Sequence, residues 1–145
     1  MERDLLLALE AAGFTLLLVG ATSDQSDAQA LCSLGLCHLI NAVGVWSLAE
    51  LTQIMSQVCC FLGLDTGTTH LAAAIGVPTL ALFGRLDPAA IGPRGEGVMI
   101  LQADNACWLS QQQRCTRLRC GHRVCLQAIK VSDIVAACRT MMEQP

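Results

Sequence analysis

A polar string near the middle of the chain has residue types that suit phosphate binding. It directly follows the apolar run 58–64, which we expect to be a buried strand, and it leads into an alanine-rich segment with helical periodicity. Open α/β sheets bind ligands at the carboxyl ends of their parallel strands. The position therefore marks the string as a candidate site. Its residues are Asp65, Thr66, Gly67, Thr68, Thr69 and His70.

Each residue type in this string has a use in binding an anion. Gly67 lets the backbone approach a ligand, and the first amides of the following helix point toward a phosphate with the positive helix end behind them. The threonines at 66, 68 and 69 add hydroxyl donors. His70 could donate to a phosphate oxygen and stabilise the charge on a departing nucleotide. The alternative is that Asp65 caps the helix and His70 lines a polar wall. An aspartic protease, whose Asp-Thr-Gly lies in an all-β fold, is excluded by the helical segment.

The elements around this string alternate between helix and strand. Helices are predicted over 4–12, 27–34, 47–57, 68–75 and 133–142, and strands over 14–19, 37–40, 58–64, 78–83 and 98–101. Ser47 and Glu50 form a capping box, and Ser132 is predicted to cap the last helix. Residues 85–97 are expected to be a loop and 104–127 an irregular segment. The alternation indicates an α/β, Rossmann-like parallel sheet with helices on both faces.

The composition limits the classes of protein to which this chain could belong. The 145 residues are 53% hydrophobic and 14% charged, which favours one packed domain over 1–145 and excludes disorder. A formal net charge of −3 argues against nucleic acid as a partner. No apolar run reaches the ~20 residues of a membrane span, and the first residues do not resemble an export signal. We therefore expect a cytoplasmic protein with mostly reduced cysteines.

The segment 104–127 holds several cysteines and arginines but lacks the spacing of a zinc site. Its C-x7-C-x4-C-x4-C pattern has no C-x2-C knuckle, so a structural cluster is favoured and no metal or other cofactor is expected. The arginines could meet an anionic acceptor or form an ordinary solvated loop. Cysteines elsewhere lie in apolar blocks and are interpreted as small core residues. The cluster consists of Cys107, Cys115, Cys120 and Cys125, beside His122, and the others are Cys32, Cys37, Cys59, Cys60 and Cys138.

The combined motifs resemble a known family of enzymes. The string Asp65-Thr66-Gly67-x-x-His70-Leu71-x-Ala73-Ala74-x-Gly76-x-Pro78 is followed by Leu82-Phe83-Gly84, Asp87-Pro88 and Gly92-Pro93. Together they are similar to the carboxy-terminal domain of glycosyltransferase family 9, the ADP-heptose:lipopolysaccharide heptosyltransferases. The resemblance extends over roughly residues 5–142.

This resemblance implies a two-lobed (GT-B), inverting and metal-independent sugar transferase, of which this chain is part of the nucleotide-sugar lobe. Asp65, Thr66, Gly67 and His70 would contact the diphosphate of an ADP-heptose or similar donor, and the acceptor would be the lipopolysaccharide core. Asp24 corresponds to an acid that binds ribose hydroxyls, and Trp46 to a side chain packed on adenine. Without the resemblance, the favoured interpretation of Asp24 is a turn or helix-start acid, and Trp46 could equally be a core or lobe-interface residue.

The sequence also departs from the family pattern. The amino-terminal lobe is missing, and with it the expected catalytic base, so we assign no catalytic residue to this chain. The first strand of the carboxy-terminal lobe is missing too, which would leave strands 14–19 and 58–64 without their shared neighbour. Such strands would re-pair directly, self-associate or need a separate first half.

Three other functions stay open from the sequence. They are a related GT-B transferase or epimerase that uses a UDP-sugar, a nucleotide-binding remnant without activity, and a small metal-binding module. For a heptosyltransferase, the place of action would be the cytoplasm, with peripheral contact at the inner face of the inner membrane left open.

Overall fold

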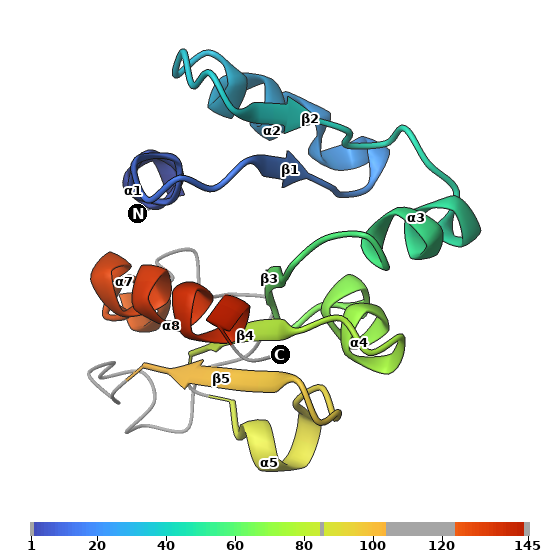
Figure 1. Cartoon of the computed structure of the whole chain (residues 1–145), viewed down its shortest axis with the longest axis vertical. Coiled ribbons are helices and arrows are strands. Elements are labelled where there is room, and N and C mark those ends of the chain that lie inside the picture. Colours follow the sequence, from blue (N-terminus) through green and yellow to red (C-terminus); the bar gives the residue numbers. More distant parts are fainter. Residues whose placement is uncertain (1, 85, 104–123, 144–145) are drawn as a thin grey trace. The chain divides into compact units, whose positions relative to one another are not determined.

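The structure is a computed structural model that describes residues 2–84, 86–103 and 124–143 (Figure 1). The chain divides into two compact units, residues 1–57 and 58–145. Each unit is described separately below.

The first unit is built on two short parallel strands. Leu16 pairs with Leu39 and Leu18 with Asn41, while α1 contacts β1 and α2 contacts β2. The strand-helix alternation predicted for this part is confirmed, with each strand shorter than expected. Its elements are α1 (Glu2–Ala11), β1 (Leu16–Leu18), the 3₁₀ turn η1 (Thr22–Asp24), α2 (Gln25–Cys32), β2 (Leu39–Asn41) and α3 (Leu48–Met55).

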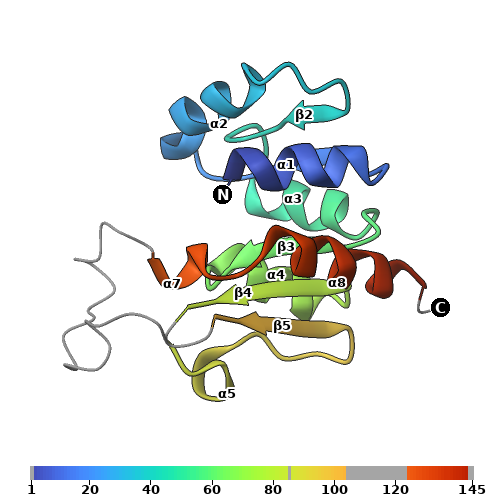
Figure 2. The same cartoon turned by 90° about the vertical axis from the view of Figure 1, so that its left-hand side faces the viewer.

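The second unit holds a three-stranded parallel sheet in the order β3-β4-β5. Helix α4 contacts β3 and β4, and in Figure 2 α8 lies in front of the three strands with α4 behind them. The predicted parallel sheet with helices on both faces is confirmed here. The elements are β3 (Phe61–Leu64), α4 (Gly67–Ala74), β4 (Thr79–Phe83), α5 (Pro88–Ile91), β5 (Val98–Gln102), α7 (Val124–Gln127) and α8 (Val131–Glu143).

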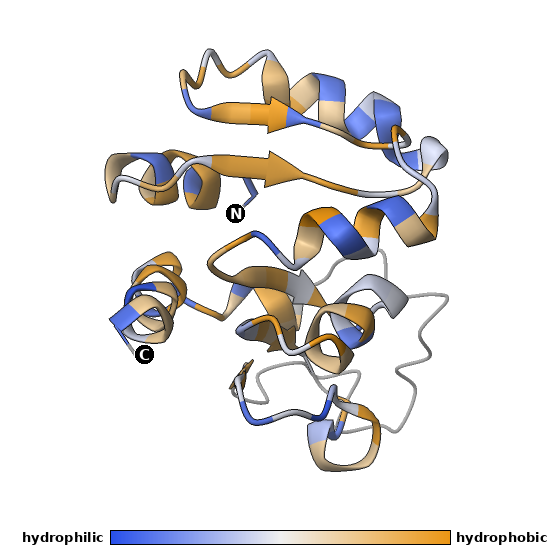
Figure 3. Cartoon of the chain, turned by 45° about the vertical axis from the view of Figure 1, so that its right-hand side comes forward, coloured by the Kyte–Doolittle hydropathy of each residue, from blue (hydrophilic) through white to orange (hydrophobic). Residues whose placement is uncertain are grey.

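The core of the second unit lies around β4. All five residues of this strand are buried, because neighbours cover both of its edges and helices cover its faces. Helix α8 adds an apolar stripe at helical spacing, which fits a helix packed by one face. Figure 3 shows the strands of the structure as predominantly hydrophobic ribbons and the helices as mixed. The buried stripe of α8 consists of Ile134, Ala137, Cys138 and Met141.

The capping box predicted at the start of α3 is confirmed. The Ser47 hydroxyl accepts from the Glu50 amide at 3.4 Å and donates to Glu50 Oε2 at 2.7 Å, and the Ser47 amide donates to the same carboxylate oxygen at 2.9 Å. These bonds from Ser47 lower the pKa of the Glu50 carboxyl. A carboxyl whose pKa is lowered by folding stabilises the folded state above its ordinary value of 4.5 and loses that effect as the pH falls through its folded-state pKa.

Ser47→Ala is expected to lower the free energy of unfolding by about 1 kcal/mol at neutral pH, because the cap hydroxyl is lost. Urea denaturation measures this difference. The matched control is Ser56→Ala at the other end of α3, which should change stability by less than ~0.5 kcal/mol. The difference in the free energy of unfolding between wild type and Ser47→Ala should become smaller as the pH falls below 4.5. An equal loss in both variants would contradict the capping role.

Several expectations about the second half need correction. The segment expected to be a loop contains α5, for which the Asp87 side chain accepts from the Ala89 amide and Pro88 takes the first helical position. Helix α7 lies within the stretch expected to be irregular. Ser132 does not cap α8, because that helix already begins at Val131, and its hydroxyl donates to Asp133 instead.

Strands β1 and β3 belong to different sheets in the described part of the chain. β1 pairs with β2, and β3 pairs with β4, so each of them has one hydrogen-bonded neighbour. Direct re-pairing of β1 with β3, self-association and a separate first half stay predictions, as does the assignment of residues 1–145 to one domain.

The cysteines are only partly the core residues that we expected. Cys138 is buried, but Cys32, Cys37 and Cys59 are exposed, so the core interpretation is wrong for these three. All of the described cysteines are free thiols. A hydrogen bond with Cys138, together with burial, raises the pKa of the Cys60 thiol. Most of the residues considered for a zinc site lie outside the described residues, so the expectation that they bind no metal stays a prediction. They are Cys107, Cys115, Cys120 and His122.

Candidate functional site

The polar string identified in the sequence lies at the carboxyl end of β3, as predicted. Thr66 is the N-cap residue of α4, with an extended backbone (φ −138°, ψ 162°), and its side chain makes no capping hydrogen bond. The first amides of a helix have no partner within the helix, and the helix dipole makes this end positive. The start of α4 is therefore suited to bind an anion, in contrast to the capped start of α3.

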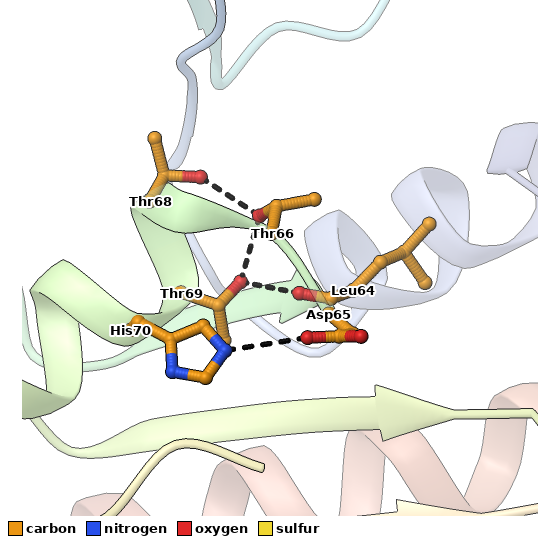
Figure 4. A network of polar contacts seen from close by, with 6 residues as sticks. All are labelled: Leu64, Asp65, Thr66, Thr68, Thr69 and His70. Atoms are coloured by element: carbon orange, nitrogen blue, oxygen red, sulfur yellow. Dashed lines mark hydrogen bonds and ion pairs between the residues drawn. The ribbon is translucent and has the colours of Figure 1, made fainter. Parts of the chain in front are cut away.

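Asp65 and His70 lie side by side at this helix end. His70 Nε2 is 3.2 Å from Asp65 Oδ1, with the histidine side chain 43% exposed and the aspartate side chain 14% exposed (Figure 4). The contact orients the imidazole ring, because the carboxylate accepts a hydrogen bond when Nε2 carries a proton. Asp65 does not cap α4, since the N-cap is Thr66. The alternative in which Asp65 is a simple helix cap is thus not observed.

The three threonines of the string are linked to one another through their hydroxyl groups. Thr66 Oγ1 is 3.0 Å from Thr68 Oγ1 and 3.1 Å from Thr69 Oγ1, and Thr69 Oγ1 donates to the carbonyl oxygen of Leu64 at 2.5 Å (Figure 4). Thr69 is fully buried, whereas Thr66 is exposed. This geometry favours a supporting role for Thr69 over the direct ligand contact expected from the sequence.

Gly63 was missed by the sequence analysis. It lies in β3, and a Cβ atom at this position would overlap Thr69 Oγ1 and stand 2.8 Å from Phe61 Cε1. A glycine inside a strand often marks a close approach of another group, and this signal could have identified it.

Asp24 and Trp46 lie in the first unit, after β1 and β2 respectively. The Asp24 carboxylate accepts from the Ala21 amide at 2.9 Å and from the Ser23 hydroxyl at 3.1 Å, so it closes its own turn while remaining exposed. Trp46 is partly buried and directly precedes the cap of α3.

The loops that carry these two residues meet at one end of the β1-β2 pair. Gly44, with φ +72°, donates from its amide to the Gly20 carbonyl at 3.0 Å, and a Cβ atom on it would be 3.0 Å from Thr22 Cα. The structure thus brings the Asp24 and Trp46 segments together within the first unit, and the residues from Asp65 to His70 together within the second.

A family model described as glycosyltransferase family 9 (heptosyltransferase) matches residues 3–120, which is most of the chain. The chain belongs to glycosyltransferase family 9. The resemblance inferred from the motifs around Asp65 and His70 is therefore confirmed, as is membership of a transferase family.

Similar proteins agree with this family assignment. Lipopolysaccharide heptosyltransferase 1 of Pseudomonas aeruginosa is 37% identical over 70 residues, which are 48% of this chain and 20% of that protein. The crystal structure of a glycosyltransferase family 9 protein from Veillonella parvula superposes with a TM-score of 0.81 at 21% identity, over 99% of this chain and 41% of that one. An Escherichia coli heptosyltransferase solved with ADP gives a TM-score of 0.74 at 21% identity, over 96% and 38%. The chain thus spans well under half the length of these proteins.

Two negative findings apply to the described part of this family 9 chain. No helix there is long and apolar enough to cross a membrane. No group of three or more histidine, cysteine or acidic side chains among these residues could hold a metal ion.

Proposed function

We propose that this chain is the nucleotide-sugar-binding part of a heptosyltransferase that transfers heptose from ADP-heptose to the lipopolysaccharide core. The observation that carries the proposal is the uncapped start of α4 beside the Asp65–His70 pair, in a member of glycosyltransferase family 9. A structural neighbour was solved with ADP, which favours an adenine over a uracil nucleotide.

The diphosphate would bind at the start of α4. The amides of Gly67 and Thr68 would donate to its oxygens, and Gly67 has open space where a side chain would otherwise stand. A doubly protonated His70 would donate from Nδ1 while Nε2 remains on Asp65. Each of these contacts becomes stronger as negative charge collects on the leaving group.

The reaction would be a single displacement at the anomeric carbon. The acceptor hydroxyl forms the new bond to that carbon as the bond to the diphosphate oxygen breaks, and the electron pair of the broken bond stays on the departing ADP. This inverts the anomeric configuration and needs no metal. The proton of the acceptor would go to a base on the amino-terminal lobe of the two-lobed enzyme.

Asp24 and Trp46 would bind the nucleoside. A carboxylate has lone pairs beyond the two used by the Ala21 amide and the Ser23 hydroxyl, and these could accept from a ribose diol. The indole of Trp46 would pack on adenine. The acceptor contact and action at the inner face of the inner membrane remain parts of the same proposal.

His70→Ala is expected to weaken ADP binding about tenfold, since a charge-assisted hydrogen bond to a phosphate is lost. Isothermal titration calorimetry of the purified chain with ADP, ADP-heptose and UDP measures this. Wild type should prefer both adenine nucleotides to UDP.

The matched control is His38→Ala, which removes an exposed histidine of the first unit and should leave the ADP affinity unchanged. Equal affinity of wild type for UDP and ADP would instead favour a UDP-sugar enzyme. Failure of a demonstrably folded chain to bind any of the three ligands would contradict the assignment of the donor site to these residues.

A further inference from the structure

The hydroxyl groups at the start of α4 have a fixed hydrogen-bond direction. A carbonyl oxygen can only accept, so the single hydroxyl proton of Thr69 is committed to Leu64. The contact between Thr66 and Thr69 must then use the proton of Thr66, and the contact between Thr66 and Thr68 must use the proton of Thr68. The chain of donors therefore runs from Thr68 to Thr66 to Thr69 and ends on the Leu64 carbonyl (Figure 4).

The contact with Thr69 also fixes where the Thr66 hydroxyl lies, and in that position it does not cap the helix. A threonine at the N-cap normally turns its hydroxyl toward the second or third amide of the helix and accepts from it. Here that hydroxyl is turned instead toward Thr69, and no side-chain cap is made. The ordinary internal partner of the helix amides is thus held away from them.

The position of Thr69 depends on Gly63. Thr69 is fully buried, and its hydroxyl occupies the space that a Cβ atom of residue 63 would take. The Thr69 side chain can therefore pack against β3 only because residue 63 of the strand is a glycine.

We propose that Thr69 is a positioning residue, which holds the Thr66 hydroxyl off the Thr68 amide and so keeps that amide available for the donor phosphate. The Thr69 and His70 amides already donate to the Thr66 carbonyl. This role of Thr69 rests on the proposed function, because it assigns the anion to the same helix start. Without the Thr69 hydroxyl, Thr66 turns to accept from the Thr68 amide, and the ligand must displace it.

Thr69→Ala and Thr69→Ser test this role, because the two variants differ only by the hydroxyl group. Thr69→Ala should weaken ADP binding about tenfold, equivalent to ~1.4 kcal/mol, while Thr69→Ser should stay within about twofold of wild type. Adding Thr66→Val to Thr69→Ala removes the competing hydroxyl and should restore part of the lost affinity, and Thr66→Val alone measures what that hydroxyl contributes to the diphosphate contact. A loss from cavity formation alone would not be restored by this second change.

The result that overturns the proposal is equal affinity in the Ala and Ser variants, or a double variant that binds no better than Thr69→Ala. Amide exchange by nuclear magnetic resonance separates this question from the proposed function, since it needs no ligand. The Thr68 amide should exchange more slowly in Thr69→Ala than in wild type and at the wild-type rate in Thr69→Ser. If wild type does not bind ADP, the proposed function fails, and the same exchange rates still decide the role of Thr69.

Discussion

Phe83→Ala is expected to unfold the second unit or leave it barely stable, with a loss of about 3–5 kcal/mol in the free energy of unfolding. Phe83 is the last residue of β4 and is 1% exposed, so its truncation leaves a cavity in the most enclosed strand of the unit. A typical domain is stable by only about 5–15 kcal/mol, which makes this a large fraction of the total. Hydrogen exchange measured on peptides from β3, β4 and β5 would follow the second unit directly.

The matched control for Phe83 is Met142→Ala. Met142 is also a large apolar residue of the second unit, but it is 51% exposed, so its loss should change the stability by less than ~0.5 kcal/mol. If Phe83→Ala were as mild as this control, the assignment of the core to β4 would be wrong.

Gly63→Ala is expected to destabilise the second unit by about 1–3 kcal/mol, although it adds only a methyl group. The new Cβ atom would overlap Thr69 Oγ1 and stand 2.8 Å from Phe61 Cε1, so either the hydroxyl or the ring must move. Because Thr69 lies in α4, its displacement should also disturb the start of that helix. Urea denaturation measures the loss, and calorimetry with ADP measures the effect on the site.

Gly67→Ala is the control for this substitution. It adds the same methyl group four residues later, where no atom lies within 4 Å of the new Cβ and the backbone needs no glycine. Its stability should match or slightly exceed that of wild type, since alanine is the better helix former. Equal stability of the two alanine variants would show that β3 accommodates a side chain at residue 63.

The type of each main element could be predicted because the signals are local. The capping box of Ser47 and Glu50 depends on residues three positions apart, and the apolar run that becomes β4 has turn residues on both sides. The short helix α5 was missed because the glycines and prolines around it favoured a loop. Its Asp87-Pro88 start, an N-cap residue followed by proline, is nevertheless a helix signal.

The boundaries of β3 depend on its partner and could not be predicted from its own residues. The apolar run begins at Val58, but the strand begins at Phe61, whose amide donates to the Pro78 carbonyl at 2.8 Å. Pro78 has no amide proton, and β4 begins only at Thr79. Residues before Phe61 therefore have no ladder to join on that side.

The position of the candidate site could be predicted from the sequence, but the role of each residue within it could not. A polar string after a buried strand indicates a ligand site whatever the contacts within it. That Thr69 bonds inward to Leu64, and that Asp24 closes its own turn, depends on side-chain directions that the string does not encode. The roles of Asp24 and Trp46 in binding a nucleoside remain predictions.

The bond between Thr69 and Leu64 also affects the edge of β3 that faces away from β4. Alternate residues of a strand direct their backbone groups to opposite sides, and Phe61 faces the β4 side, so the Leu64 carbonyl points to the opposite side of β3, where no strand of the described residues pairs. A further strand added there could pair with Leu62, but at Leu64 it would meet a carbonyl that already accepts one hydrogen bond from a hydroxyl group and has one lone pair left. The contact that shapes the turn thus leaves the last carbonyl of β3 as an acceptor that any added strand would share with Thr69.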